Sequence, residues 1–284
     1  MNKNLHILFL FFIALALLPL LSSFYYLKSE WKLVATIKTQ PIQKVSIDTY
    51  SNFYIADNKG NVFKFDSLGK QQLQFSPLKK GDVSLLEAWR TVNIFIFYRD
   101  LQEYILLDRF LTTSQENFSF RQFNNNDEKR IGYARLANLA SDNNLWVFDD
   151  EDFSLKKYNT SLNKVILHTP LDLILDPSFY DLTYMREYQN LLFINDKNSG
   201  ILIFDNLGNY KTKLPYKNVN YFNFKGNVIY FLSENHLVVF DIYTSRQQAI
   251  PLPEEKIYNY VLLGENKSYF FSKENIDIYN FPHN

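Results

Sequence analysis

Apolar and polar residues alternate in short runs along the chain, and the runs recur in similar pairs. An apolar run passes through a polar turn into a second apolar run, as in Phe53 to Asp57 followed by Val62 to Asp66. The second run ends at a polar stop residue six times, at Asp66, Asp108, Asn159, Asp205, Asp241 and Asn280. Stops roughly 40 residues apart, with four short strands in each interval, predict an all-β fold, a six-bladed β-propeller.

The flanking segments complete each predicted blade. Innermost strands are expected near six short runs, which begin at Val45, Val83, Ala134, Tyr180, Val219 and Tyr258. Outermost strands are expected to end at four prolines, Pro77, Pro170, Pro215 and Pro251. Proline lacks an amide hydrogen, so it is tolerated at the edge of a sheet and not inside it.

The last blade has only three strands of its own, while the segment from Trp31 to Thr39 stands alone before the first blade. We expect this segment to be the outer strand of the last blade, paired antiparallel with Ile276 to Tyr279. Closure of the ring in this way removes open sheet edges. We also expect Leu33, Val34 and Ile37 to be buried by this pairing.

Two turns have a recognisable chemistry. The sequences Asp66-Ser67-Leu68-Gly69 and Asp205-Asn206-Leu207-Gly208 place Asp at the start of a turn and Gly at its end. An Asp side chain in this position accepts hydrogen bonds from the turn's own backbone, and Gly supplies a positive φ. These aspartates are therefore interpreted as turn formers and not as catalytic groups.

The N-terminal residues 1–28 form a separate hydrophobic unit, for which a helix is expected, and residues 29–284 form the propeller. Lys3 precedes the uncharged run from Ile7 to Leu21. This layout is typical of a secretory signal, cleaved near Ser23, or of a transmembrane anchor formed by residues 7–27, since about 20 apolar residues cross a bilayer. Both alternatives deliver the propeller outside the cytoplasm, either periplasmic or secreted, or bound to the cytoplasmic membrane.

Composition narrows the possible functions. The 284 residues include 30 basic and 30 acidic side chains, so no overall field favours a nucleic-acid partner, and none is expected. The chain has no cysteine, which excludes disulfides, thiolate catalysis and Cys-ligated zinc. The four histidines are scattered, without metal-ligand or triad spacing.

The stretch from Asp48 to Gly69 resembles the NHL-repeat group of propellers, through its Ala56-Asp57 and Phe65-Asp66-Ser67-Leu68-Gly69 runs. The likeness is weaker in later repeats. More loosely, the chain resembles six-bladed gluconolactonase-like enzymes, and that resemblance implies a divalent metal over the central channel. The comparable positions here are a mixed set, Lys44, Asp82, Arg135, Asp181, Asn220 and Asn259.

Candidate binding residues are aromatic or basic side chains near predicted blade edges. Trp89, Arg90, Arg99 and Arg135 fit the residue types enriched at binding hot spots, although Trp89 also suits packing between blades. The acidic run from Asp149 to Asp152 could ligate calcium, but its residues are consecutive and lack a glycine bend. A solvated turn is the preferred interpretation of this run.

Together these features predict a non-enzymatic binding or scaffold module without a cofactor. A bound divalent cation is kept as an alternative. It would contact the membrane through its N-terminal segment and a protein or small ligand on one propeller face. The alternative is a metal-dependent hydrolase or lactonase of the gluconolactonase-like type. A scaffold without an obvious catalytic group favours the first hypothesis, because function on common folds resides in local sites.

Overall fold

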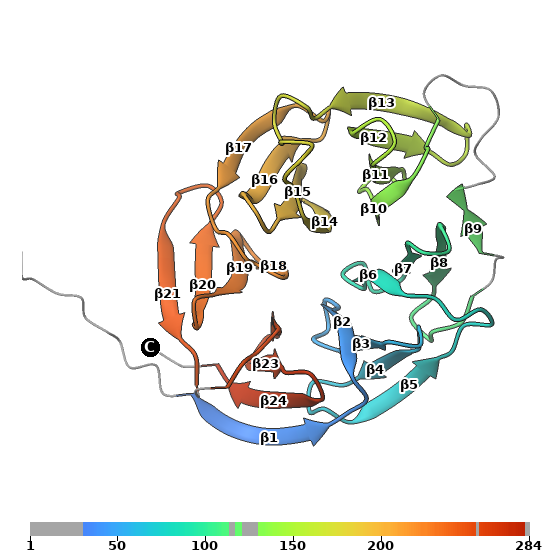
Figure 1. Cartoon of the computed structure of the whole chain (residues 1–284). Coiled ribbons are helices and arrows are strands. Elements are labelled where there is room, and N and C mark those ends of the chain that lie inside the picture. Colours follow the sequence, from blue (N-terminus) through green and yellow to red (C-terminus); the bar gives the residue numbers. More distant parts are fainter. Residues whose placement is uncertain (1–30, 114–116, 121–129, 254–255, 282–284) are drawn as a thin grey trace, which may run out of the picture.

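The computed structural model describes residues 31–113, 117–120, 130–253 and 256–281. These residues form six four-stranded antiparallel sheets arranged as a closed ring around a central axis (Figure 1). The described ranges contain strands and turns but no α-helix. The prediction of an all-β, six-bladed propeller is therefore confirmed.

Each blade is a meander whose strands run from the axis to the rim. Blades 1 to 3 comprise β2 (Ile42–Ile47), β3 (Phe53–Asp57), β4 (Val62–Phe65) and β5 (Gln71–Phe75); β6 (Val83–Glu87), β7 (Ile94–Tyr98), β8 (Glu103–Leu107) and β9 (Phe118–Ser119); and β10 (Ala134–Leu139), β11 (Leu145–Asp149), β12 (Ser154–Asn159) and β13 (Lys164–Pro170). Blades 4 to 6 comprise β14 (Leu182–Tyr188), β15 (Leu191–Asp196), β16 (Gly200–Asp205) and β17 (Tyr210–Leu214); β18 (Phe222–Lys225), β19 (Val228–Ser233), β20 (His236–Asp241) and β21 (Gln247–Pro251); and β22 (Tyr260–Leu263), β23 (Lys267–Phe271), β24 (Asn275–Asn280) and β1 (Lys32–Lys38).

Ring closure follows the prediction in its topology but not in its packing. β1 pairs antiparallel with β24, from Lys32 opposite Asn280 to Lys38 opposite Asn275. The expected burial of Leu33 and Val34 is wrong, because these side chains are 44% and 47% exposed. They belong to the outermost strand of the blade, where no further strand or sheet covers them, and the register shifts between Leu33 and Ala35.

Ile37 is half-buried and packs against the core, and Trp31 and Thr36 supply the contacts that Leu33 and Val34 do not. The Trp31 ring lies edge-on to Phe270 at 5.1 Å and to Tyr279 at 6.0 Å, and its Nε1 donates to the Pro251 carbonyl at 2.8 Å. Thr36 Oγ1 donates to Asp277 Oδ1 at 2.6 Å. An aromatic anchor therefore fastens the closing strand to blades 5 and 6.

Aromatic side chains fill the space between neighbouring blades. Phe53 of blade 1 contacts Tyr269 of blade 6 with ring centroids 4.7 Å apart, and Phe193 of blade 4 contacts Phe224 of blade 5 at 4.8 Å. These rings are fully buried or nearly so. The aromatic excess of the sequence thus serves the interblade core, where large flat side chains pack between twisted sheets.

Strand direction defines two faces of the ring. We call the top face the one on which the innermost strand of each blade begins, and the bottom face the one on which it ends. Turns between first and second strands, and between third and fourth strands, lie on the bottom face. Turns between second and third strands, and the connections between blades, lie on the top face.

The predicted turn chemistry is confirmed. Asp66 Oδ1 accepts hydrogen bonds from the amides of Leu68 and Lys70 at 3.0 and 2.9 Å, and Asp205 Oδ1 accepts from Leu207 and Asn209, both at 2.9 Å. The turn glycines Gly69 and Gly208 have φ of +86° and +79°. These turns lie between third and fourth strands, on the bottom face.

The predicted N-terminal helix, and with it the signal peptide or anchor, lies in residues 1–30, outside the described residues. Among the described residues, no helix is long and apolar enough to cross a membrane.

Candidate functional site

The topology separates the four candidate binding residues onto opposite faces. Trp89 and Arg90 follow the innermost strand β6, so they lie on the bottom face. Arg99 follows β7, whose end pairs with the start of β6, and Arg135 lies at the start of β10. Arg99 and Arg135 therefore lie on the top face, so the four residues cannot form one continuous surface.

On the bottom face, Trp89 and Arg90 make contacts within the protein. The Trp89 ring is 5.8 Å from that of Tyr188 and 5.0 Å from the Arg186 guanidinium. Arg90 donates to Asn143 Oδ1 at 2.9 Å and to the Ala140 carbonyl of blade 3. Both side chains are half-buried and link blades 2, 3 and 4. Trp89 therefore packs between blades, which was the alternative interpretation of this residue.

A buried polar network crosses the channel between the two faces. Glu87 of blade 2 accepts a hydrogen bond from Tyr184 of blade 4 at 2.8 Å, and its carboxylate is 3.4 Å from Arg186 Nε. Arg186 also donates to Asn223 of blade 5. Burial raises the pKa of the Tyr184 hydroxyl well above its ordinary value, so this group stays a donor.

The sequence analysis did not find this network. The available signal was a charged residue in each of two largely apolar innermost strands, Glu87 at the end of β6 and Arg186, followed by Glu187, in β14. Arg186 lies below the rings of Trp89, Tyr188 and Phe224, at 5.0 to 5.7 Å from their centroids. Its Nη2 has no hydrogen-bond partner in the described part of the chain, and these ring faces stabilise the charge in place of an acceptor.

The top mouth of the channel collects basic side chains from different blades. Lys44 lies near the start of β2 in blade 1, Arg99 in the β7–β8 turn of blade 2, and Lys197 in the β15–β16 turn of blade 4. Burial, together with the positive charges of Arg99 and Lys197, lowers the pKa of Lys44 to about 8, although the carboxylate of Asp82 opposes the shift. These basic groups are therefore close enough to repel one another.

None of these three side chains has a hydrogen bond or ion pair within the described ranges. Two other charged residues on this face have partners. Arg135 Nε lies 2.7 Å from Asp150 Oδ1, with the Tyr180 ring 5.0 Å from its guanidinium, and Asp82 accepts a hydrogen bond from Gln43. The top mouth thus offers three basic side chains that have no hydrogen bond or ion pair in the described chain.

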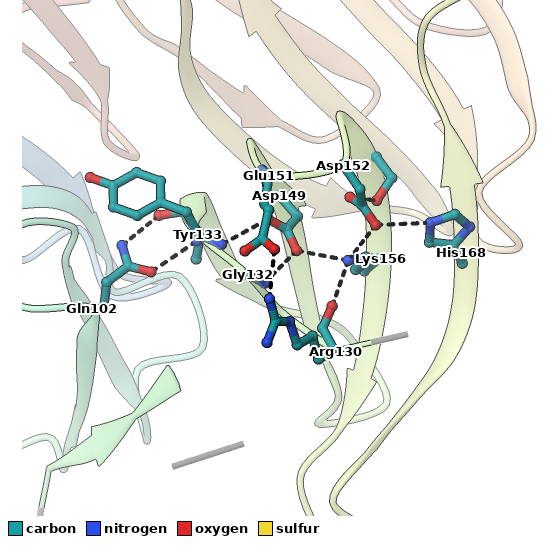
Figure 2. A network of polar contacts seen from close by, with 11 residues as sticks. Gln102, Arg130, Gly132, Tyr133, Asp149, Glu151, Asp152, Lys156 and His168 are labelled. Atoms are coloured by element: carbon teal, nitrogen blue, oxygen red, sulfur yellow. Dashed lines mark hydrogen bonds and ion pairs between the residues drawn. The ribbon is translucent and has the colours of Figure 1, made fainter. Parts of the chain in front are cut away.

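The acidic run is the predicted solvated turn only in part, because Glu151 and Asp152 are exposed in the β11–β12 turn whereas Asp149 is the last residue of β11. Asp149 is fully buried and its Oδ2 lies 2.7 Å from the ammonium of Lys156, which is itself buried (Figure 2). Lys156 also contacts Asp152 at 2.7 Å, and Glu151 pairs with Arg130 at 2.7 Å. Every carboxylate of the run has a partner outside it, because Lys156 pairs with Asp149 and Asp152, Arg135 with Asp150, and Arg130 with Glu151, while His168 also contacts Asp152.

This network holds residues 130–134, which lead into β10, against blade 3. The Asp149 carboxylate accepts hydrogen bonds from the amides of Gly132 and Tyr133 at 2.7 and 2.8 Å, and Gln102 bonds the backbone of Ala134 at both its nitrogen and its carbonyl (Figure 2). In the described ranges, no group of three His, Asp or Glu residues is placed to hold a metal ion. The acidic run therefore has a structural task.

Comparison with known proteins finds similar structures but no similar sequence. No protein family matches the sequence, and neither does any curated protein. A streptogramin B lyase structure has a TM-score of 0.61 with this chain at 13% identity, over 88% of this chain and 96% of that one. BamB from Moraxella catarrhalis has a TM-score of 0.51 with this chain at 9% identity, over 89% of this chain and 98% of that one. The structure of YCF48 bound to D1 peptide has a TM-score of 0.56 at 9% identity, over 89% of this chain and 97% of that one.

The chain is a six-bladed β-propeller. Its structural neighbours are propellers with varied roles, and at these identities the likeness shows the fold alone.

Proposed function

We propose that this protein is a non-enzymatic binding module, held outside the cytoplasm by its N-terminal segment, that binds an acidic segment of a partner protein on its top face. The observation that carries the proposal is the meeting of Lys44, Arg99 and Lys197 at the top mouth, where none of the three side chains has a hydrogen bond or ion pair in the described chain and only the Asp82 carboxylate lies near enough to raise the pKa of Lys44. Unpaired basic groups from three blades suit a ligand that brings its own negative charge.

The half-buried position of Lys44 strengthens this argument. The charged ammonium of Lys44 is disfavoured by desolvation and by two neighbouring cations. A carboxylate placed between these groups would relieve the repulsion and would be only weakly screened by solvent. Arg99 would add the planar donor geometry that matches a carboxylate.

The hydrolase alternative finds no support in the same ring of positions. A divalent cation at the channel mouth requires several carboxylate or amide oxygens. Lys44 and Arg135 place positive charges there instead, and the Asp150 carboxylate is engaged by Arg135 and Tyr180. Electrostatic repulsion therefore opposes a metal at this mouth.

The N-terminal segment supports attachment to a membrane. From Leu5 to Leu27 the sequence has 23 residues without an Asp, Glu, Lys or Arg, followed by Lys28. This length is enough to span the hydrocarbon core, and Tyr25 and Tyr26 suit the interface. We propose that the segment is retained as an anchor.

The binding proposal can be tested with a fluorescent oligo-glutamate peptide and the full-length protein in liposomes. The peptide should bind with an affinity that falls as salt rises, because the contact is charge-based. Replacing Lys44, Arg99 and Lys197 together by Gln should weaken binding at least tenfold, whereas an oligo-glutamine peptide should not bind.

A second triple variant is the matched control. Lys38, Lys211 and Lys213 are exposed residues of the outer strands β1 and β17, so their replacement by Gln removes the same charge from the rim. Equal loss of binding in both triple variants would show a general charge effect and would overturn the site.

A further inference from the structure

The bottom face carries exposed apolar side chains at one repeated position. In blades 1 to 5, the tip of the turn between third and fourth strands is Leu, Phe or Tyr, and each is more than half exposed, namely Leu68, Phe110, Leu162, Leu207 and Tyr243. Isolated exposed apolar residues are normal, but their recurrence in five consecutive blades on one face is not explained by packing.

Local hydrogen bonds hold these tips outward. The amides of Leu68, Phe110, Leu207 and Tyr243 each donate to the Asp two residues earlier, at 2.9 to 3.0 Å. The amide of Leu162 donates to Asn159 Oδ1 at 2.6 Å. The turn backbone is therefore satisfied internally, and the apolar side chain at the tip is free to meet another surface.

An exposed basic residue accompanies every tip. These residues are Lys70, Arg109, Lys164, Lys211 and Arg246, each within four positions of the apolar residue. The Arg109 guanidinium lies 4.8 Å from the Phe110 ring. Four of the tips adjoin turn carboxylates that accept the amides of their own turns, and the bottom face also carries the exposed carboxylates of Asp142 and Glu265 in turns between first and second strands. Apolar side chains flanked by Lys and Arg suit the interface of a bilayer, where the apolar part enters and the cation stays with the headgroups.

The sixth blade lacks this turn, and the N-terminal segment joins the ring at that place. Its third strand, β24, ends at Asn280 on the bottom face, and its outer strand, β1, begins at Lys32 opposite Asn280. Leu27, the last residue of the apolar segment, is four residues from Trp31. These residues span at most about 15 Å when fully extended. An anchor in the membrane would thus hold the bottom face close to the bilayer.

We propose that the bottom face of the propeller rests on the membrane surface, with the five turn tips in the interface and the N-terminal anchor as the sixth point of contact. This inference rests on the proposed anchoring. A ring of separate tips at the rim fits a broad, flat surface better than a protein partner, which would favour one contiguous cluster. In this orientation the top mouth faces away from the membrane and is open to partners.

Single cysteines offer a clean test, because the native chain has none. Leu68 or Leu207 would be replaced by Cys on the bottom face, and Leu78 or Leu173 on the top face, where both are almost fully exposed. Each full-length variant would carry an environment-sensitive fluorophore in protein-free liposomes of phosphatidylcholine and phosphatidylglycerol. The bottom-face probes should emit at shorter wavelength and be quenched several-fold more by nitroxide-labelled lipids than the top-face probes.

The outcomes separate the two proposals. Flotation with the liposomes after an alkaline carbonate wash tests the anchor alone, and its failure would overturn the anchoring and this inference together. Flotation with equal quenching on both faces would overturn the membrane contact while the anchor stands. Stronger quenching on the top face would reverse the orientation. Bottom-face probes that stay in water until a partner protein is added would assign this face to a protein.

Discussion

At the scale of single residues, charged side chains inside the ring differ in whether they have a partner within the protein. Lys156 and Arg186 are both almost completely buried, and each faces a carboxylate of its own protein. A buried charge without a partner is costly, so these pairs belong to the fold. Lys44 differs because burial and nearby cations lower its pKa to about 8 and no carboxylate bonds it in the described chain. Such a group is a functional candidate for a stated physical reason.

Replacement of Lys44 by Met should stabilise the protein at neutral pH. The folded-state pKa of Lys44 is about 8, below its ordinary value of 10.5, so folding disfavours the charged form. The unfolded chain holds more protons between these two pH values, and the stability of the native protein rises with pH there. The gain from Lys44→Met should be complete below pH 8 and should vanish towards pH 10.5. Urea unfolding of both proteins at pH 7, 9 and 10.5 measures it, and a pH-independent difference would contradict the shifted pKa.

At the scale of elements, the closing strand shows that strand pairing and side-chain burial are separate contributions. β1 contributes backbone hydrogen bonds to the edge of β24, while Leu33 and Val34 are exposed and Ile37 is half-buried against the core. Trp31, just before the strand, contributes the aromatic contacts. The closing strand is therefore held by its backbone hydrogen bonds, by Trp31, and by the contacts of Thr36 and Ile37.

Trp31→Ala should lower the free energy of unfolding by about 2 kcal/mol, because the half-buried ring loses its contacts with Phe270 and Tyr279. Leu33→Ala, at a half-exposed site of the same strand, should change it by less than about 0.5 kcal/mol. Chemical denaturation of the two variants compares them directly. An equal effect would show that β1 is held by general apolar burial.

Removal of the whole strand tests closure. A chain that begins at Ile42 should aggregate or melt far below one that begins at Ser29, since the edge of a three-stranded blade would be exposed. The chain from Ser29 keeps Trp31 and β1 and serves as the control. Equal melting temperatures for the two chains would mean that β1 is dispensable for the ring.

At the scale of the whole molecule, the two faces differ in what they offer. The top mouth has unpaired basic groups, and the bottom rim has apolar turn tips around the place where the N-terminal segment joins. The buried Glu87 and Arg186 network joins blades 2, 4 and 5 inside the ring. A disc with one face towards a membrane and the other towards partners would satisfy both proposals.

Mass spectrometry of the mature N-terminus tests the arrangement at this scale. A retained anchor predicts an intact N-terminal segment in the membrane fraction, because about 20 apolar residues hold a chain in the bilayer. Cleavage would instead give a start near Phe24 and a protein free of membranes. A chain that keeps Met1 in the soluble cytoplasmic fraction would contradict export in either form.

The sequence by itself determined the blade count, the closing strand and the turn chemistry, because these depend on local period and on the residues a tight turn accepts. Phe65-Asp66-Ser67-Leu68-Gly69 is readable as a strand and turn without any partner. For the same reason the separate N-terminal segment could be recognised from its composition. Whether this segment is cleaved or retained as an anchor is still a prediction.

Only the tertiary structure decided which residues meet. Trp89 and Arg99 are ten residues apart, yet the antiparallel meander places them on opposite faces. Asp149 looked solvated until Lys156 and the amides of Gly132 and Tyr133 were brought to it. Lys44, Arg99 and Lys197 come from three blades and converge only when the ring closes. Local pattern specifies strands and turns, whereas burial and charge pairing depend on contacts between segments far apart in the chain.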